Sequence, residues 1–298
     1  MQAPDRWGQA PDGHARAGAQ GPEVKACRPC LGTYVEIRLG EGASDAALST
    51  AFAHIERVQR CMSVFNPDSD VSRINRLHPG ETIQVDPWTH EVLTLACEVH
   101  RASGGLFDCG VAPHLARWGM LPSAVAAVSA SSIANLEMRS GHRVRSRAPV
   151  QIDLGGIAKG YAVDQAVTAL QTAGVKGGVV NAGGDLRVFG EAEEDIWLRD
   201  PAEPEHLRHA GTLRDGACAT SATYYSRRSV DGHEVSALVD PRTGTAVNAR
   251  QSYTVVAPRC AVADALTKVL ALARDPHHPC LATYGAHAVV LSPASCLP

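Results

Sequence analysis

The sequence has no apolar run of the roughly 18 residues that a membrane-spanning helix requires, so we expect no membrane segment. It also lacks a strong excess of charge of either sign, because its net charge is only −3. Proteins that bind nucleic acid or an anionic membrane through their overall field carry a clear surplus of positive charge. We therefore expect no nucleic-acid partner.

Several common catalytic motifs are missing as well. The 13 histidines include no HExxH or other metal-ligand spacing, and the chain contains no GxSxG, Walker A or GxGxxG pattern. These absences argue against a hydrolase elbow, a P-loop and a Rossmann dinucleotide site. A catalytic function has to come from other residues.

The cysteines do not form a disulfide pattern. Nine are scattered through the chain, and this odd number is typical of free thiols in a reducing cytoplasm. Cys27 and Cys30 form a lone CxxC pair, which precedes a strand-like run and has no second pair with which to hold a metal ion. We interpret these two residues as incidental thiols.

The start of the chain differs in composition from the rest. Residues 1–23 are rich in glycine, alanine, proline and polar residues and contain no hydrophobic signal core, so we expect a disordered tail and not a secretory signal. No linker or internal repeat follows. We predict a tail over residues 1–26, a single domain over residues 27–298 and a cytoplasmic location.

Strand-like and helical segments alternate without a strict βαβ rhythm, and many of the strands look antiparallel, which indicates an α+β fold. The apolar spacing predicts long helices at 43–61, 88–103, 157–173 and 262–273. It predicts strands at 33–39, 150–154, 177–181, 186–189, 196–199, 217–221, 236–239, 253–257 and 288–291.

The most informative segment is Asp-Leu-Gly-Gly-Ile-Ala-Lys-Gly-Tyr at residues 153–161, between a predicted strand and a predicted helix. Glycines let a backbone approach an anionic ligand, free N–H groups at a helix start face it, and Lys159 adds positive charge. We favour a ligand-binding or catalytic turn here over an ordinary strand-to-helix turn.

A second candidate lies near the start of the helix predicted at 262–273. Asp264 and Thr267 are three residues apart, so their oxygens can share one helical face and bind a hard cation such as Mg²⁺. The alternative is an aspartate favoured only by the helix dipole. Lys268 is placed either to reach a phosphate or to point into solvent.

Together, these segments resemble the ApbE family of FAD:protein FMN transferases. The order of the motifs is more specific than any one of them. The matching pieces are the segments at 31–37, 62–69, 105–108 with Trp118 and Gly119, 153–161, 180–185, 219–221, 236–244 and 263–267.

The resemblance implies a T-fold-like α+β core with a mixed or antiparallel sheet packed by helices. It also implies an Mg²⁺-dependent enzyme that cleaves FAD, attaches FMN to a threonine or serine of an acceptor flavoprotein and releases AMP. The residues expected to contact FAD are Leu31, Phe65, Leu106, Phe107, Asp108, Asp153, Lys159, Leu238 and Val239. Gly156, Asp264 and Thr267 are the expected metal ligands, and Lys159 and Asp264 the expected catalytic residues.

Two positions depart from the family pattern. Ala237 stands where the family commonly has histidine, and Lys268 stands where many members have threonine or serine. These changes keep two alternatives open: an FAD-binding protein with weak or no transferase activity, and an FAD pyrophosphatase that gives FMN and AMP. Of the histidines near Ala237, His233 can replace the missing side chain only if its loop folds back.

Overall fold

An antiparallel sheet organises the molecule. The computed structural model describes residues 7–8, 24–40, 42–123, 128, 130–223 and 226–293. Its main sheet has the strand order β15–β14–β9–β8–β7–β3–β2, with β1 paired to β9. The strands are β1 (Trp7–Gly8), β2 (Val24–Cys30), β3 (Thr33–Leu39), β7 (Gly177–Ala182), β8 (Asp185–Arg199), β9 (Leu207–Ala222), β14 (Ser252–Ala257) and β15 (His287–Leu291).

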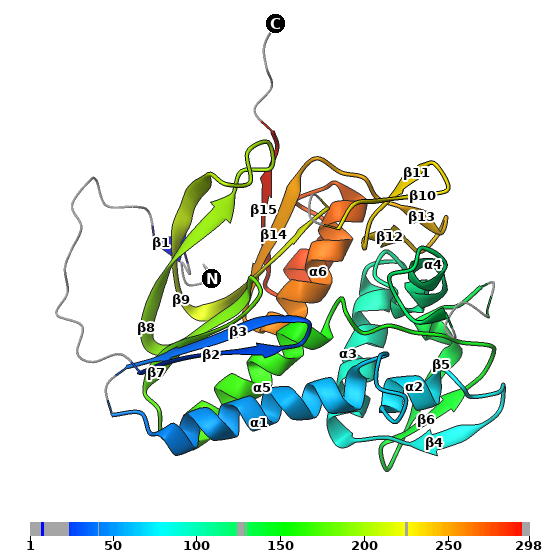
Figure 1. Ribbon diagram of the computed structural model, residues 1–298, viewed down its shortest axis with the longest axis horizontal. Coiled ribbons are helices and arrows are strands. Elements are labelled where there is room, and N and C mark those ends of the chain that lie inside the picture. The colour runs from blue at the N-terminus through cyan, green and yellow to red at the C-terminus, as the bar shows by residue number, and fades with distance from the viewer. Residues whose placement is uncertain are drawn as a thin grey trace, which may run out of the picture.

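Three long helices, α1 (Asp45–Met62), α5 (Ala158–Thr172) and α6 (Cys260–Ala273), form the layer beside this sheet (Figure 1). Side chains alternate between the two faces of a strand, so Val35, Ile37 and Leu39 of β3 are all buried. The predicted α+β class with an antiparallel sheet and packed helices is confirmed.

The remaining elements gather at one end of the sheet (Figure 1). A small β4–β6–β5 sheet lies there with the long helix α3, several short helices and two hairpins. These elements are α2 (Asp70–Ile74), β4 (Thr82–Gln84), α3 (Pro87–Ala102), η1 (Cys109–Val111), α4 (Ala112–Arg117), η3 (Ile133–Asn135), β5 (Leu136–Arg139), β6 (Arg143–Ser146), β10 (Arg228–Val230), β11 (His233–Val235), β12 (Val239–Asp240), β13 (Thr245–Ala246) and α7 (Pro279–Thr283). Of these elements, η1, α4 and β12 line a cavity together with residues of α5 and α6.

The strand predicted at 150–154 is wrong. This segment is extended and its apolar side chains are buried, but it joins no sheet. The side-chain amide of Asn75 donates to Ile152 O at 2.9 Å and accepts from Ile152 N at 2.7 Å. Asp153 N donates to Cys109 O at 2.9 Å. These bonds replace the ladder of a neighbouring strand.

Other boundaries also differ from the prediction. The strands predicted at 186–189 and 196–199 are one continuous strand, β8, and β9 begins at Leu207, ten residues before the strand predicted at 217–221. Of the strand predicted at 236–239, only Val239 is in β12, because the Ser236 hydroxyl bonds to Leu238 and Val247 in place of a ladder. At the N-terminus, β2 begins at Val24, three residues before the predicted domain boundary. Apart from Trp7–Gly8, the tail predicted over 1–23 lies outside the described residues.

In the described part of the chain, the cysteines agree with the expectation of free thiols that was drawn from the sequence. Eight of them are free thiols, and Cys27 and Cys30 lie on β2. Among the described residues, no helix is both long and apolar enough to cross a membrane.

Candidate functional site at the junction of two helices

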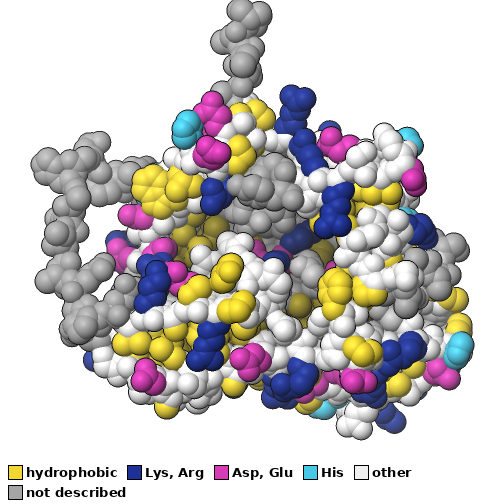
Figure 2. Space-filling view, in the orientation of Figure 1, with side chains coloured by type: hydrophobic (Ala, Val, Ile, Leu, Met, Phe, Trp, Pro, Cys, Tyr) yellow, Lys and Arg dark blue, Asp and Glu magenta, His cyan; other side chains and the backbone are white. Residues whose placement is uncertain are grey.

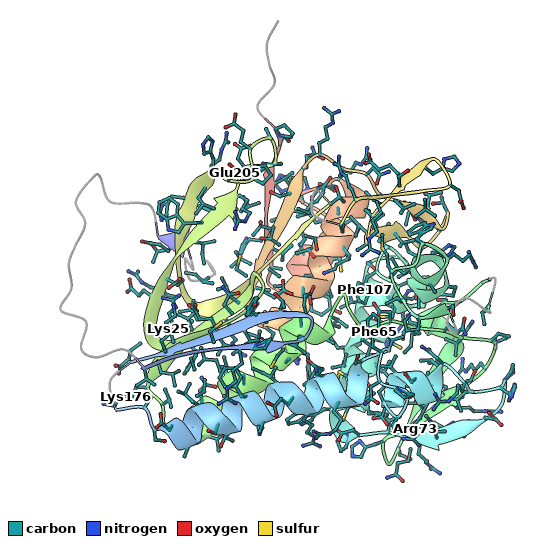
Figure 3. The ribbon with its side chains drawn as sticks, viewed as in Figure 1. Lys25, Phe65, Arg73, Phe107, Lys176 and Glu205 are labelled. Atoms are coloured by element: carbon teal, nitrogen blue, oxygen red, sulfur yellow. The ribbon has the colours of Figure 1, made fainter. Side chains whose placement is uncertain are left out.

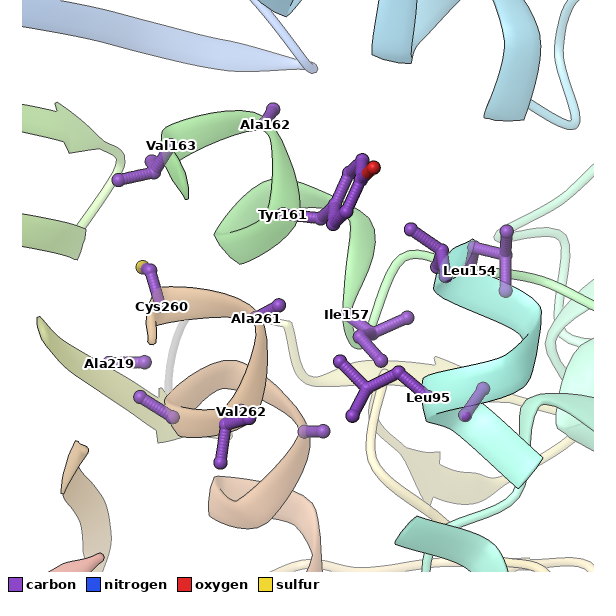
Figure 4. Packing of buried hydrophobic residues seen from close by; sticks show 14 of the residues in the cluster. Leu95, Leu154, Ile157, Tyr161, Ala162, Val163, Ala219, Cys260, Ala261 and Val262 are labelled. Atoms are coloured by element: carbon purple, nitrogen blue, oxygen red, sulfur yellow. The ribbon is translucent and has the colours of Figure 1, made fainter. Parts of the chain in front are cut away.

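The first turns of α5 and α6 meet at Gly160. A Cβ atom at this position would lie 2.3 Å from Cys260 O, so only glycine allows this approach. Asp164 of α5 fixes the contact by accepting the N–H groups of Cys260 and Ala261 at 2.9 and 3.0 Å. Small and apolar side chains fill the contact around these turns (Figure 4). Gly160 thus packs two helices together, a role that differs from the predicted contact with a ligand.

This packing brings Asp264 to Lys159. Helix α6 begins at Cys260, two residues before the predicted start, so Asp264 lies in its second turn and is fully buried. Its Oδ2 atom accepts hydrogen bonds from Lys159 Nζ and Gly160 N, both at 3.3 Å. Its Oδ1 atom is held by the ammonium group of Lys268. One buried carboxylate therefore joins two lysines that are far apart in the sequence.

Asp185 completes the charged cluster, although it was not among the site residues predicted from the sequence. It lies at the start of β8 with its carboxylate 2.7 Å from Lys159 Nζ, and it is buried. The available signal was the acidic residue that ends the Asn-Ala-Gly-Gly-Asp segment, which we matched to the family pattern without giving Asp185 a role. Lys159 thus lies between two carboxylates.

The electrostatics of the cluster follow from burial and pairing. Burial, together with the neighbouring charge of Asp264, raises the pKa of Asp185 to about 6 in spite of Lys159. Burial also acts to raise the pKa of Asp264, but Lys159 and Lys268 outweigh it and lower that pKa to about 2. Burial alone would lower the pKa of Lys159, yet the two carboxylates raise it. Lys159 and Asp264 are therefore a charged pair at neutral pH.

The glycine turn lies directly beside this cluster. Asp153 Oδ2 accepts a hydrogen bond from Gly155 N at 3.1 Å, and Lys159 Nζ lies 3.4 Å from Gly155 O. Burial raises the pKa of Asp153, partly offset by Gly155 N–H and Lys159. The helix start is less free than predicted, because the N–H groups of Ala158 and Gly160 donate to Leu154 O and Asp264.

A cavity of about 450 Å³ opens from the turn toward η1, α4 and β12. Its lining combines Asp153 and the cluster residues Lys159 and Lys268 with apolar walls. Predicted residues in this lining are Leu106, Phe107, Asp108, Asp153, Gly156, Lys159, Leu238 and Val239. Figure 2 shows the molecule hollowed near the centre of this face, where basic and acidic side chains meet.

A second cavity of about 270 Å³ lies on the other side of the same turn. Leu31 and Phe65 line it, and it shares Asp153, Gly155 and Lys159 with the first cavity. Phe65 is 67% exposed although it is a large apolar residue. Figure 3 labels Phe65 and Phe107, which lie in the same region of the molecule, beside the turn. The two hollows therefore meet at the lysine-bearing turn.

Leu31 occupies a strained position in this second cavity. It has φ 57° and Gly32 has φ 72°, as a two-residue type I′ hairpin turn between β2 and β3 requires. Leucine rarely adopts this left-handed conformation, and such outliers gather at ligand sites. Leu31 N donates to Gln59 Oε1 at 2.5 Å, which holds the turn against α1.

Some predicted contact groups are already engaged within the protein. The Asp108 carboxylate accepts hydrogen bonds from Gly110 N, Ile133 N and the Ser132 hydroxyl at 2.6–2.7 Å. Leu238 O accepts from Val247 N at 2.8 Å, and Leu238 N donates to the Ser236 hydroxyl at 3.3 Å. Asp108 and Leu238 thus shape the cavity wall, with their polar atoms directed at protein groups.

The missing histidine has no replacement among the described residues that line either cavity. Ala237, which stands where the family commonly has histidine, lines the larger cavity. His233 is exposed on β11, paired with Val230 in the β10–β11 hairpin, and is not part of the lining. The loop that carries His233 therefore does not fold back toward Ala237, and His233 does not replace the missing histidine.

The predicted metal ligands lie on two adjacent segments beside the cluster. Asp264 and Thr267 lie on the same part of α6, and a Cβ atom on Gly156 would be 3.3 Å from Lys268 Cε, so the turn and helix are adjacent. A carboxylate, a hydroxyl and a backbone carbonyl suit Mg²⁺ chemically. No group of three histidine, cysteine or acidic side chains in the described ranges forms another candidate.

Comparison with known proteins identifies the family to which this fold and site belong. The model of the ApbE family matches residues 31–289. The FAD:protein FMN transferase of Rhodobacter capsulatus is 30% identical over 89% of this chain, which spans 54% of that relative. The FAD:protein FMN transferase of Vibrio cholerae is 28% identical, with 84% of this chain and 82% of the relative covered.

Solved structures agree with the family match. The ApbE protein from Thermotoga maritima has a TM-score of 0.78 and 27% identity, with 92% of this chain and 98% of that chain covered. The flavin transferase ApbE from Vibrio cholerae has a TM-score of 0.77 and 25% identity, with 90% and 93% covered. The resemblance deduced from the ordered motifs is thereby confirmed, and the chain belongs to the ApbE family.

Proposed function

We propose that this chain is an FAD:protein FMN transferase. It cleaves the diphosphate of FAD, joins the FMN phosphate to a threonine or serine hydroxyl of an acceptor flavoprotein, and releases AMP. The relatives that bear this name supply the reaction class. The observation that carries the proposal is the pair of cavities that meet at Lys159, since FAD has two ring systems joined by a diphosphate.

The proposed ligand contacts follow the walls of the two cavities. Leu31 and Phe65 form an apolar wall on one side of the turn, and Leu106, Phe107, Asp108, Leu238 and Val239 form the wall on the other side. Apolar and aromatic faces suit flat ring systems. The diphosphate then lies over Asp153 to Lys159. We assign the activity to a single domain over residues 27–298.

Phosphoryl transfer needs positioning and charge neutralisation more than covalent help. The ammonium groups of Lys159 and Lys268 line the larger cavity and are fixed by Asp185 and Asp264. Gly156, Asp264 and Thr267 are the proposed Mg²⁺ ligands, and a bound Mg²⁺ supplies further neutralisation of phosphate charge. Asp264 serves the site mainly by holding the two lysines in position.

The acceptor hydroxyl must lose its proton as it attacks phosphorus. Asp153 lines both cavities, and burial raises the pKa of its carboxyl group, which makes it a better proton acceptor. We propose that Asp153 takes the proton in this chain, where Ala237 replaces the family histidine. We further propose a cytoplasmic location, which the eight free thiols of the described part support.

The test is incubation of the purified chain with FAD, Mg²⁺ and an acceptor flavoprotein domain that carries a threonine or serine target. Transfer makes the acceptor covalently fluorescent and releases one AMP for each flavin attached. Release of AMP with free FMN and no labelling would instead identify a pyrophosphatase. FAD binding with neither product would identify an FAD-binding protein without catalysis.

Phe65→Ala is expected to weaken FAD binding about tenfold, because base–aromatic stacking is worth about 1–3 kcal/mol. The melting temperature should stay unchanged, since Phe65 is already 67% exposed. Tyr34→Ala is the matched control: this aromatic residue is 71% exposed and lines neither cavity. Equal FAD affinity of the two variants in fluorescence titration would exclude Phe65 from the ligand site.

FAD binding is expected to tighten as pH falls through about 6, where Asp185 titrates. Protonation removes a negative charge beside Lys159, and a bound diphosphate in turn favours the protonated acid, so binding takes up protons. We expect a change of up to about tenfold between pH about 7.5 and about 5.5.

Asp185→Asn should flatten this dependence, whereas Asp195→Asn, which changes an exposed acid on β8, should retain it. The measurement is an FAD titration in EDTA at each pH. A slope that persists in Asp185→Asn would show that another group controls it.

A further inference from the structure

We infer that the ammonium group of Lys268 is a tethered cation that occupies the place of a divalent metal ion beside Asp264. FAD therefore binds to this chain without Mg²⁺, and Mg²⁺ enters only by displacing Lys268. The inference rests on the proposed function and deepens it, because it concerns the cation that faces the diphosphate.

The contacts of Lys268 are those of a small bound cation. Its Nζ atom donates to Asp264 Oδ1 and to Asp264 O, the latter at 3.0 Å, so it bridges a carboxylate and a backbone carbonyl. The side chain lines the larger cavity next to Gly156 and is only 21% exposed. A carboxylate and a carbonyl are also oxygen donors that a magnesium ion would use at this place.

The other donors near this position are engaged as well. The Thr267 hydroxyl donates to Asp264 O at 2.7 Å and shares a hydrogen bond of 2.7 Å with the Ser221 hydroxyl. Asp264 Oδ2 accepts from Lys159 and Gly160. Since Mg²⁺ requires near-octahedral oxygen ligands, its entry means that Lys268 leaves Asp264 and that Thr267 turns away from its present partners.

The charge count leads to the same conclusion. The carboxylates of Asp185 and Asp264 are in contact with the ammonium groups of Lys159 and Lys268, so two negative charges meet two positive ones. No divalent ion is needed to neutralise these four groups. A lysine is a compact charge on a flexible stem, so Lys268 can turn from Asp264 toward a phosphate that enters beside Gly156.

Lys268→Thr tests this inference, because it exchanges the ammonium group for a hydroxyl one helical turn after Asp264. In the wild type, the FAD dissociation constant should differ by less than about threefold between EDTA and millimolar Mg²⁺, a free-energy difference below about 0.7 kcal/mol. In Lys268→Thr, FAD binding in EDTA should weaken about tenfold or more, and Mg²⁺ should restore it.

Mn²⁺ serves as a second probe that does not depend on turnover. Electron paramagnetic resonance of free Mn²⁺ should show binding to Lys268→Thr at least about tenfold tighter than to the wild type. Lys268→Arg keeps the positive charge and should bind FAD in EDTA. Lys176→Thr, which changes an exposed lysine outside both FAD cavities, should match the wild type (Figure 3).

Tight Mn²⁺ binding by the wild type, or loss of its FAD binding in EDTA, would overturn the inference. Either result would leave the proposed function intact if labelled acceptor still forms with Mg²⁺. Conversely, a wild type that binds FAD in EDTA and never labels an acceptor would retain the inference about Lys268 and refute the transferase proposal. The two failures are therefore separable.

Discussion

Asp264→Asn is expected to lower transferase turnover by about 100-fold while FAD affinity changes by less than about threefold. Asparagine has nearly the same volume, and its amide oxygen can still accept the Gly160 N–H. It lacks the negative charge that holds Lys159 and Lys268 in place. The reaction depends on fixed positive charge at the breaking diphosphate bond, whereas FAD binding also draws on the apolar walls of both cavities. We therefore expect the substitution to reduce turnover much more than FAD affinity.

The measurement is the initial rate of covalent flavin labelling together with an FAD titration. Asp45→Asn, which changes an exposed acid at the start of α1, is the control and should keep the wild-type rate. Thermal unfolding of Asp264→Asn checks that the helix junction survives, since Asp264 is fully buried. Wild-type turnover in a folded Asp264→Asn variant would remove Asp264 from the catalytic site.

Local patterns predicted the four long helices and most strands of the main sheet, because short-range packing decides these elements. The alternation at 33–39 and the helical spacing at 157–173 match β3 and α5 closely. The segment at 150–154 misled the prediction because its apolar residues are buried as in a strand, while its hydrogen bonds come from the distant side chain of Asn75. An alternating apolar pattern indicates which side chains are buried, but it does not show which groups the backbone N–H and C=O groups bond to.

The candidate site shows the same limit. The types of residue in the turn at 153–161 and in the segment around Asp264 are enough by themselves to indicate an anionic ligand. Their direct contact arises from Gly160 and Asp164, which pack α5 against α6 across about a hundred residues of sequence. Asp185 was missed because only the folded sheet brings it to Lys159. The sequence thus showed which residue types could carry the chemistry, but it did not show which of these residues are in contact in the folded protein.

Lys159→Met is expected to have the largest effect of all, with turnover reduced about 1,000-fold and FAD affinity reduced at least tenfold. Lys159 Nζ lies 2.7 Å from Asp185 and 3.3 Å from Asp264 and lines both cavities. Methionine keeps much of the stem but leaves the buried carboxylates of Asp185 and Asp264 without the lysine between them, with only Lys268 still paired to Asp264. These would repel the diphosphate as well as one another, so binding and chemistry should fail together.

The same variant should reveal the lost pairing in its stability. Without Lys159, the pKa of Asp185, already raised to about 6, should rise further above its value in the unfolded chain. A carboxyl group with a raised folded-state pKa costs stability as pH increases, so the loss in melting temperature should be larger at about pH 8 than at about pH 5.5. Lys176→Met should show neither effect. A uniform loss of stability at both pH values would mean that Lys159 acts through packing, and the electrostatic account of this site would then fail.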